Sequence, residues 1–166
     1  DSVNCATGAI PHRVVFPLNG NMLPADLSAG NIFRDKLTVV DLGQDKDPNP
    51  GGAGDPLQRI HDLAATYPPV RLLSIRAAKD PEQNPGQNVI QIGDSWKLIR
   101  IPEEDLRSFA KCGLVLLDFA PEAAVWPKRL VLVDASGRIR GYYQAGDYEE
   151  TDRLILEMKI LLEEEY

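Results

Sequence analysis

The amino-acid sequence predicts an α/β protein with a central mixed β-sheet flanked by helices. Three observations lead to this prediction. Apolar runs rich in β-branched residues alternate with segments of helical spacing, two later strand-like runs form a hairpin, and an amphipathic helix follows the hairpin. An order of βαβ, then hairpin, then helix requires both parallel and antiparallel strand pairs. The length of 166 residues suits one domain with one sizeable core.

The first half of the chain is expected to contain three strands and one helix. The run KLTVVDLG is almost continuously apolar, as in a strand that is covered on both faces. After it, Asp55 is a suitable N-cap and Pro56 a suitable first helical residue, and the pair Pro68-Pro69 ends that helix. We expect strands at residues 12–16, 36–43 and 70–77, and a helix at 57–67.

The second half of the chain begins with a turn-rich connection, AKDPEQNPGQN. The sequence DASGR is a tight connection between the two strands of the hairpin, and Asp147 with Glu150 is typical of a capping box at the start of the last helix. We expect strands at 96–101, 113–119, 129–134 and 139–146, a helix from Pro102 through Lys111, and a final helix from Asp147 almost to Tyr166.

The charge of the chain narrows its possible partners. With 25 acidic and 18 basic side chains, the net charge is −7 at pH 7. Nucleic acids are excluded because no excess of lysine and arginine is available to neutralise phosphates, and anionic membranes are disfavoured for the same reason. No apolar run reaches the roughly 18 residues of a spanning helix, so we expect no membrane insertion. A basic protein partner suits this charge better.

The cysteines and histidines do not form a recognisable metal motif. Cys5 and Cys112 are too few and too far apart for a zinc site or a CxxC redox pair, and Cys112 is expected to be a small buried apolar residue. His61 is expected at a surface or half-buried position of its helix, and His12 opens a strand. We therefore expect no cofactor and no metal. The alternative is a copper site built from Cys112, His61, His12 and Cys5.

The segment DLGQDKDPNPGGAGDP joins a strand to a helix, a junction at which many proteins place reactive residues. It contains no cysteine, histidine or serine. Asp45, Asp47 and Asn49 alternate as calcium ligands do, but Pro50 stands where an EF-hand needs glycine and Pro56 where it needs a bidentate glutamate. Its glycines lack the Lys-Ser/Thr ending of a phosphate loop. We expect a solvated acidic loop.

The last third of the chain, RLVLVDASGRIRGYYQAGDYEETDRLILEMKILL, is similar to the C-terminal portion of SCO/SenC proteins. The segments VRLLSIRAAKDPEQ and LTVVDLG also resemble parts of that family, which has a thioredoxin-like fold and delivers copper to cytochrome c oxidase. The resemblance implies a thioredoxin-like fold here, with Pro127 before a buried strand in the place of the superfamily's cis-proline. A cis peptide bond has a low free-energy cost only when it precedes proline.

The copper ligands of that family do not carry over to this sequence. The family uses a CxxxC between strand and helix and a histidine before the penultimate strand. Here the second position holds Trp126, Pro127 and Lys128, and the first holds a cysteine-free loop. Because soft thiolates select Cu(I), carboxylates do not replace them. The resemblance thus implies a degenerate active-site loop, whose candidate residues are Gln44, Asp45, Asp47, Asn49 and Asp55.

The missing ligands favour a non-catalytic protein over an enzyme, and the resemblance implies its role: a binding, assembly or structural partner in cytochrome oxidase biogenesis that has lost copper and thiol chemistry. Two alternatives remain at this point. One is an active metal or thiol chaperone with non-standard ligands, and the other is a permanent accessory subunit of a larger extracytoplasmic complex. Candidates for the partner surface are the aromatic residues Trp96, Trp126, Tyr142 and Tyr143, which could instead pack in the core.

The resemblance also implies a location and a domain plan. We expect an extracytoplasmic protein, periplasmic or tethered to a membrane by an N-terminal segment that precedes Asp1. Residues 1–10 are expected to form a flexible tail and residues 11–166 a single thioredoxin-like domain. The expected partner is a protein, either a basic one or a component of a membrane complex.

Overall fold

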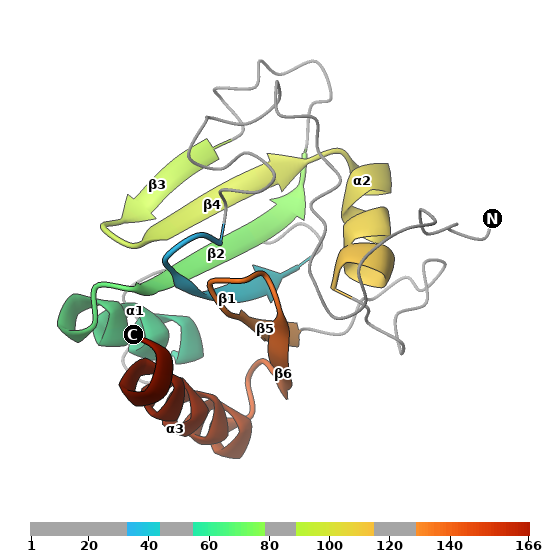
Figure 1. Ribbon diagram of the computed structural model, residues 1–166. Helices are drawn as coiled ribbons and strands as arrows, with labels where there is room; N and C mark the ends of the chain where they lie inside the picture. Colours follow the sequence, from blue (N-terminus) through green and yellow to red (C-terminus); the bar gives the residue numbers. More distant parts are fainter. Residues whose placement is uncertain (1–32, 44–54, 79–88, 115–128) are drawn as a thin grey trace.

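The computed structural model describes residues 33–43, 55–78, 89–114 and 129–166. Within these residues, six strands form one mixed sheet in the order β3-β4-β2-β1-β5-β6 (Figure 1). Strands β1, β2 and β4 run parallel to one another, whereas β3, β5 and β6 pair antiparallel with their neighbours. The strands are β1 (Leu37–Leu42), β2 (Val70–Ala77), β3 (Val89–Gly93), β4 (Trp96–Ile101), β5 (Arg129–Val133) and β6 (Ile139–Gln144).

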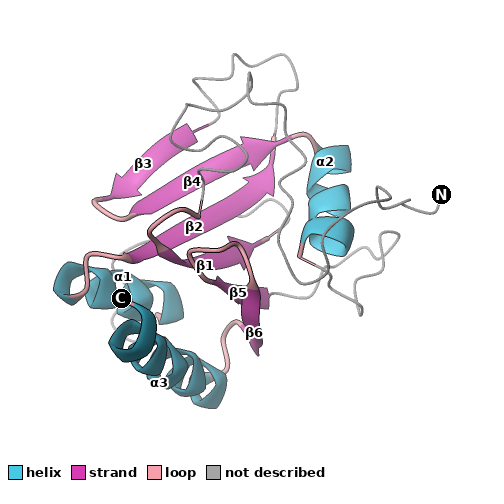
Figure 2. Cartoon of the chain, viewed as in Figure 1, coloured by secondary structure: helices cyan, strands magenta, loops and turns pink. Residues whose placement is uncertain are grey.

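Helices cover both faces of the sheet (Figures 1 and 2). Helices α1 (Pro56–Thr66) and α3 (Tyr148–Glu165) pack on one face. Helix α2 (Glu103–Ser108), which continues into a π-helical turn η4 (Phe109–Gly113), packs on the other. The expected α/β class, the mixed sheet with flanking helices, and the hairpin β5-β6 followed by a helix are therefore confirmed.

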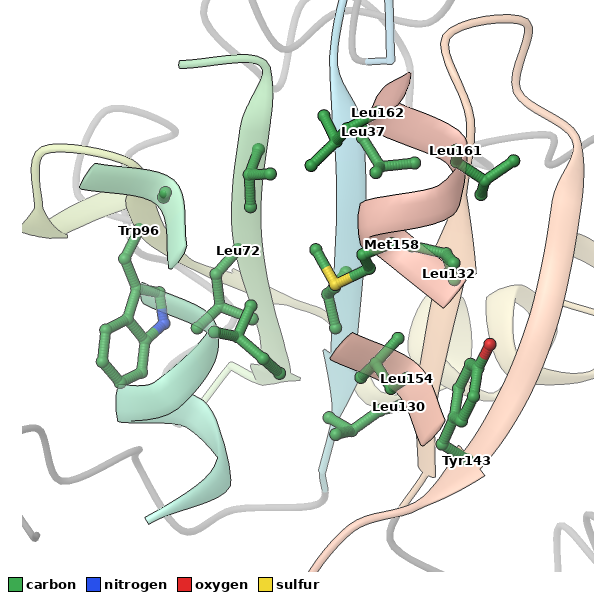
Figure 3. Packing of buried hydrophobic residues seen from close by; sticks show 14 residues of the cluster. Leu37, Leu72, Trp96, Leu130, Leu132, Tyr143, Leu154, Met158, Leu161 and Leu162 are labelled. Atoms are coloured by element: carbon green, nitrogen blue, oxygen red, sulfur yellow. The ribbon is translucent and has the colours of Figure 1, made fainter. Parts of the chain in front are cut away.

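The two faces of β1 contribute to two separate hydrophobic clusters. Leu37 and Val39 pack with residues of α1 and α3, shown in Figure 3, whereas Val40 and Leu42 pack with residues of α2 and η4. All six residues of β1 are buried. Side chains alternate between the faces of a strand, so a strand between two helical layers must be apolar at almost every position. That requirement explains the uninterrupted run in the sequence.

Side-chain caps begin both long helices. The Asp55 carboxylate accepts a hydrogen bond from the Leu57 N–H at 2.8 Å, with Pro56 as first helical residue, as expected. The Asp147 carboxylate accepts from the N–H groups of Glu149 and Glu150 at 2.9 and 3.3 Å. The second half of the expected capping box differs: the Asp147 N–H donates to the Gln144 carbonyl, and the Glu150 carboxylate accepts from Arg153.

Asp134 organises the turn of the hairpin. Its buried carboxylate accepts hydrogen bonds from the N–H groups of Ser136 and Arg138 and from the Arg140 guanidinium, at 2.9, 3.0 and 3.0 Å. Gly137 adopts a φ of +81°, which a side chain would disfavour. The tight connection expected from DASGR is confirmed.

The described strands differ from the sequence prediction in two places. Strand β3 was not expected, because the segment before β4 reads as a connection. Gly113 closes η4 and Leu114 follows it in a bend, so a strand that begins at Gly113 is wrong for these two residues. Residues 115–119 and the expected strand at 12–16 lie outside the described residues.

No described helix combines the length and apolar character needed to cross a membrane.

Candidate functional site

The candidate site is the end of β1 and the start of α1, which border the loop expected to be degenerate. Gln44, Asp45, Asp47 and Asn49 lie outside the described residues. Asp55, the last candidate of that loop, acts as the N-cap of α1. Its carboxylate is thus engaged by the backbone of the first helical turn, a structural role worth about 1 kcal/mol in typical helices.

A buried ion pair lies directly before this loop. Asp41 of β1 and Arg76 of β2 are 6% and 5% exposed, and their side chains meet at 2.8 Å between Oδ2 and the guanidinium. The same guanidinium also donates to the backbone carbonyls of Asp41 and Ile75, at 2.9 and 3.0 Å. Several hydrogen bonds therefore hold the arginine in one position, which offsets the cost of removing both charges from water.

Ser74 and Trp96 extend this polar network beneath α1. The Ser74 hydroxyl donates to Asp41 Oδ2 at 2.9 Å, and the Trp96 indole N–H donates to the Ser74 oxygen at 2.9 Å. The parallel pairing of β1, β2 and β4 brings these residues together on the face that α1 covers. No sequence motif predicts the network, because its members come from three strands.

Gly43 marks the point where the chain leaves β1 above this ion pair. A Cβ atom at Gly43 would lie 2.8 Å from Arg76 Cζ. The Gly43 N–H donates to the Ile75 carbonyl at 3.2 Å, which keeps the backbone close to β2. A side chain at this position would displace the Arg76 guanidinium, so glycine is favoured here.

His61 packs against the same region from α1. Its ring centroid lies 5.6 Å from that of Trp96 in a tilted arrangement. A Cβ atom at Gly93 would lie 2.5 Å from His61 Nε2, so the missing side chain of Gly93 makes room for the imidazole. The expected half-buried position of His61 is confirmed.

The alternative copper site built from histidine and cysteine finds no support in the described residues. Cys112 belongs to η4 on the α2 face of the sheet, and His61 belongs to α1 on the opposite face. The sheet therefore separates the two segments. His12 and Cys5 lie outside the described residues, and the described part of the chain brings no three His, Cys, Asp or Glu residues together as metal ligands.

The expectation of an exposed aromatic partner surface is wrong for two of its four residues. Trp96 and Tyr143 are each 1% exposed and belong to the cluster under α1 and α3 (Figure 3). Both lie on the sheet face that α1 and α3 cover, which fits the alternative of core packing. Tyr142 lies on the opposite face of β6 and is 39% exposed, and its hydroxyl donates to the Leu114 carbonyl at 2.7 Å. Trp126 and Pro127 lie outside the described residues.

Tyr143 joins α3 to β6 through a second polar cluster that the sequence did not indicate. Its hydroxyl donates to Glu157 Oε2, and the Arg153 guanidinium lies 4.3 Å from the centre of its ring. Burial, followed by the hydrogen bond to Glu157 and its negative charge, raises the pKa of the Tyr143 phenol. The phenol is therefore neutral at physiological pH and acts as a hydrogen-bond donor.

Comparison with known proteins gives no match to a family model or to a curated protein. Solved structures do match. BsSco, a member of the Sco family of cytochrome c oxidase assembly proteins, is similar with a TM-score of 0.58 and 15% identity over 92% of this chain and 96% of that one. A SCO1/SenC family lipoprotein from Bacillus anthracis str. Ames gives a TM-score of 0.54 and 20% identity over 80% and 85% of the two chains.

A thiol-disulfide protein is similar to a comparable degree. The putative thiol:disulfide interchange protein DsbE from Chlorobium tepidum gives a TM-score of 0.54 and 8% identity over 93% of this chain and 99% of that one. At these identities the similarity concerns the fold, and it agrees with the sheet order and helix placement described above. The chain has a thioredoxin-like fold, and solved Sco-family proteins are among the structures that it resembles.

Proposed function

We propose that this chain is a non-catalytic binding protein on a Sco-like frame, which acts as an assembly or structural partner in respiratory oxidase biogenesis without copper or thiol chemistry. The observation that carries the proposal is chemical. The sequence between β1 and α1, where the resemblance places a copper-binding cysteine pair, contains no cysteine. Thiolates are the ligands that select Cu(I) and permit disulfide exchange, and carboxylates serve neither purpose.

The ion pair beside this loop supports the same proposal. Asp41, Arg76 and Ser74 are buried and bonded to one another. A group that acts on a substrate needs access to it, whereas these groups stabilise the junction of β1 and β2. They maintain the shape of the frame where the family performs its chemistry.

The likeness to Sco structures supports the biological setting. BsSco belongs to a family described as cytochrome c oxidase assembly proteins, and the Bacillus anthracis relative is described as a lipoprotein. By analogy, we place this chain outside the cytoplasm, where it binds a protein partner of an oxidase complex.

A Cu(I) titration of the reduced protein tests the loss of copper chemistry. The wild type and the Cys112→Ser variant are titrated against a competing chelator of known affinity. We expect neither protein to compete. Stoichiometric, sub-nanomolar binding by the wild type that Cys112→Ser abolishes would overturn the proposal in favour of a site with unusual ligands.

A complementation experiment tests whether the biological role needs thiols. The gene is deleted, and oxidase activity in membranes is measured after return of the wild type or the double variant Cys5→Ser/Cys112→Ser. We expect a loss on deletion and equal restoration by both proteins. If the double variant accumulates to normal levels but does not restore activity, the non-catalytic account is wrong.

A further inference from the structure

The outer face of α3 exposes apolar side chains that the fold leaves uncovered. Leu156 and Ile160 are 60% and 46% exposed, although Leu154 and Met158 on the inner face are fully buried. Residues four apart lie one above the other on a helix, so Leu156 and Ile160 form one continuous apolar patch. In Figure 1, α3 lies at the periphery of the molecule, with α1 on one side and β6 on the other.

A hollow of about 300 Å³ adjoins this patch between α3 and the hairpin. Leu132 and Leu161 give it apolar walls, and Ile160 lies at the junction with the exposed patch. The hollow is of a size that accepts an apolar side chain. Its lining also includes Arg140, Glu157 and Glu164.

Acidic side chains surround the apolar patch. Helix α3 carries seven carboxylates and two basic side chains, so it holds a charge of −5 of the chain's −7. Arg153 is already bonded to Glu150 and Glu157, at 2.9 and 3.3 Å. Glu163 and Glu164 are exposed and follow Ile160 by three and four residues. Arg59 and Arg140, from outside the helix, pair with Asp152 and Glu165 and offset part of this charge. The charge around the patch remains negative.

We propose that Leu156, Ile160 and the adjoining hollow form a docking surface for a basic amphipathic segment of a partner protein. The partner would place apolar side chains on the patch and in the hollow, and its lysines or arginines near Glu163 and Glu164. This inference rests on the protein-binding role proposed above, and it adds the surface and the chemistry of the partner.

The charge of α3 argues against two other occupants. A second copy of the chain would bring a second helix of charge −5 to the same surface, and like charges in contact are unfavourable. An anionic lipid surface would be repelled for the same reason. A basic protein segment satisfies both the apolar patch and the surrounding carboxylates.

Synthetic peptides test the docking surface on the full chain. The probe is a peptide with leucines at helical spacing flanked by lysines, and its controls replace the lysines with glutamates or the leucines with serines. Binding is measured by calorimetry and by the shifts of backbone amide signals. We expect only the first peptide to bind, to shift signals of α3 and β6, and to bind more weakly as salt is added.

Surface variants provide the matched controls. Leu156→Ser/Ile160→Ser should weaken peptide binding by about tenfold or more, as expected for central contacts of an interface. Glu163→Lys/Glu164→Lys should weaken it and reduce its salt dependence. Ile90→Ser, at a residue of β3 that is 41% exposed, should leave binding unchanged. Because all these side chains are exposed, we expect each variant to keep the melting temperature of the wild type within a few degrees.

Several results would overturn the inference. Equal binding by the wild type and the Leu156→Ser/Ile160→Ser variant would place the peptide elsewhere, and so would amide shifts confined to regions away from α3 and β6. If the peptide with leucines and lysines does not bind, the proposed docking surface is wrong. A dimer of the wild type that this variant abolishes would show that a second copy is the occupant. None of these results affects the copper titration or the cysteine-free complementation, which test the proposed function separately.

Discussion

The polar network at the end of β1 and the outer face of α3 both depart from the pattern of apolar residues inside and polar residues outside. At the end of β1, Asp41 and Arg76 are buried charges that pair with each other, and they also bond to the Ser74 hydroxyl and to a backbone carbonyl. On α3, Leu156 and Ile160 are apolar side chains that face solvent. The buried charges are paired within the chain, whereas the apolar side chains of α3 remain exposed to solvent.

This difference separates structural features from binding features. A buried charge is tolerated only when it is paired, so the network at the end of β1 contributes to the frame and offers little to a ligand. An exposed apolar patch costs free energy that contact with another molecule recovers. Substitutions in the first region should therefore affect folding, and substitutions in the second should affect association.

Breaking the ion pair should give the largest effect. Arg76→Met should lower the free energy of unfolding by about 3–5 kcal/mol, because it leaves the Asp41 carboxylate buried without its partner. Urea denaturation measures the change. The double variant Asp41→Leu/Arg76→Met is the control and should recover much of the loss, since no unpaired charge then remains. A single variant as stable as the wild type would show that the pair contributes little to the frame.

Two leucines of α3 allow a buried and an exposed apolar side chain to be compared within one helix. Leu154 is fully buried and Leu156 is 60% exposed. Leu154→Ala should destabilise the protein by about 2–5 kcal/mol because it opens a cavity in the cluster of Figure 3. Leu156→Ala should change stability by less than about 0.5 kcal/mol. Thermal unfolding of the two variants decides the matter, and similar losses would mean that Leu156 also supports the fold.

Gly43 and Gly93 each lie against a side chain that an added Cβ atom would have to displace, and the two side chains differ in their freedom to move. Gly43→Ala should cost about 1–3 kcal/mol, because the Arg76 guanidinium in its way is held by several hydrogen bonds. Gly93→Ala meets the half-buried ring of His61, which can turn toward solvent, so its cost should be smaller. Denaturant midpoints of the two variants test this order, and the reverse order would contradict the rigidity of the network.

Tyr143 should give the smallest effect, one that is visible only at alkaline pH. Its pKa is raised in the folded protein above the ordinary value of about 10. The neutral phenol is therefore favoured by folding, and this stability is complete below pH 10 and is lost as the pH rises toward the folded pKa. In a spectroscopic titration of the phenols, Tyr143 should ionise last. Tyr143→Phe should remove that final step, and an unchanged titration curve would disprove the assignment.

The sequence predicted the layered architecture well because that architecture depends on local patterns. The apolar run before Gly43 and the spacing of leucines after Asp147 each specify an element and its buried face. Helix starts were predicted because a cap requires one residue and its immediate neighbours. Strand β3 was missed because five residues with mixed exposure form a strand only when a partner is present.

The candidate site was only partly predictable. The sequence showed that the loop between β1 and α1 lacks cysteine, since composition is a local property. It did not predict that Trp96 is buried and donates to Ser74, because residues 22 positions apart meet only through sheet pairing. Tyr142 and Tyr143 illustrate the same limit: alternation predicts that they face opposite ways, but not which face lies under α3.

The sequence by itself determined the fold class, the helix caps, the negative charge and the absence of thiol ligands from the loop, because each follows from residues near one another in the chain. Only the tertiary structure decided that Asp41 and Arg76 form a buried ion pair, that His61 and the segment containing Cys112 lie on opposite faces, and that Leu156 and Ile160 remain exposed. These outcomes depend on which strands pair and which helical faces pack, and both are set by contacts between residues distant in sequence.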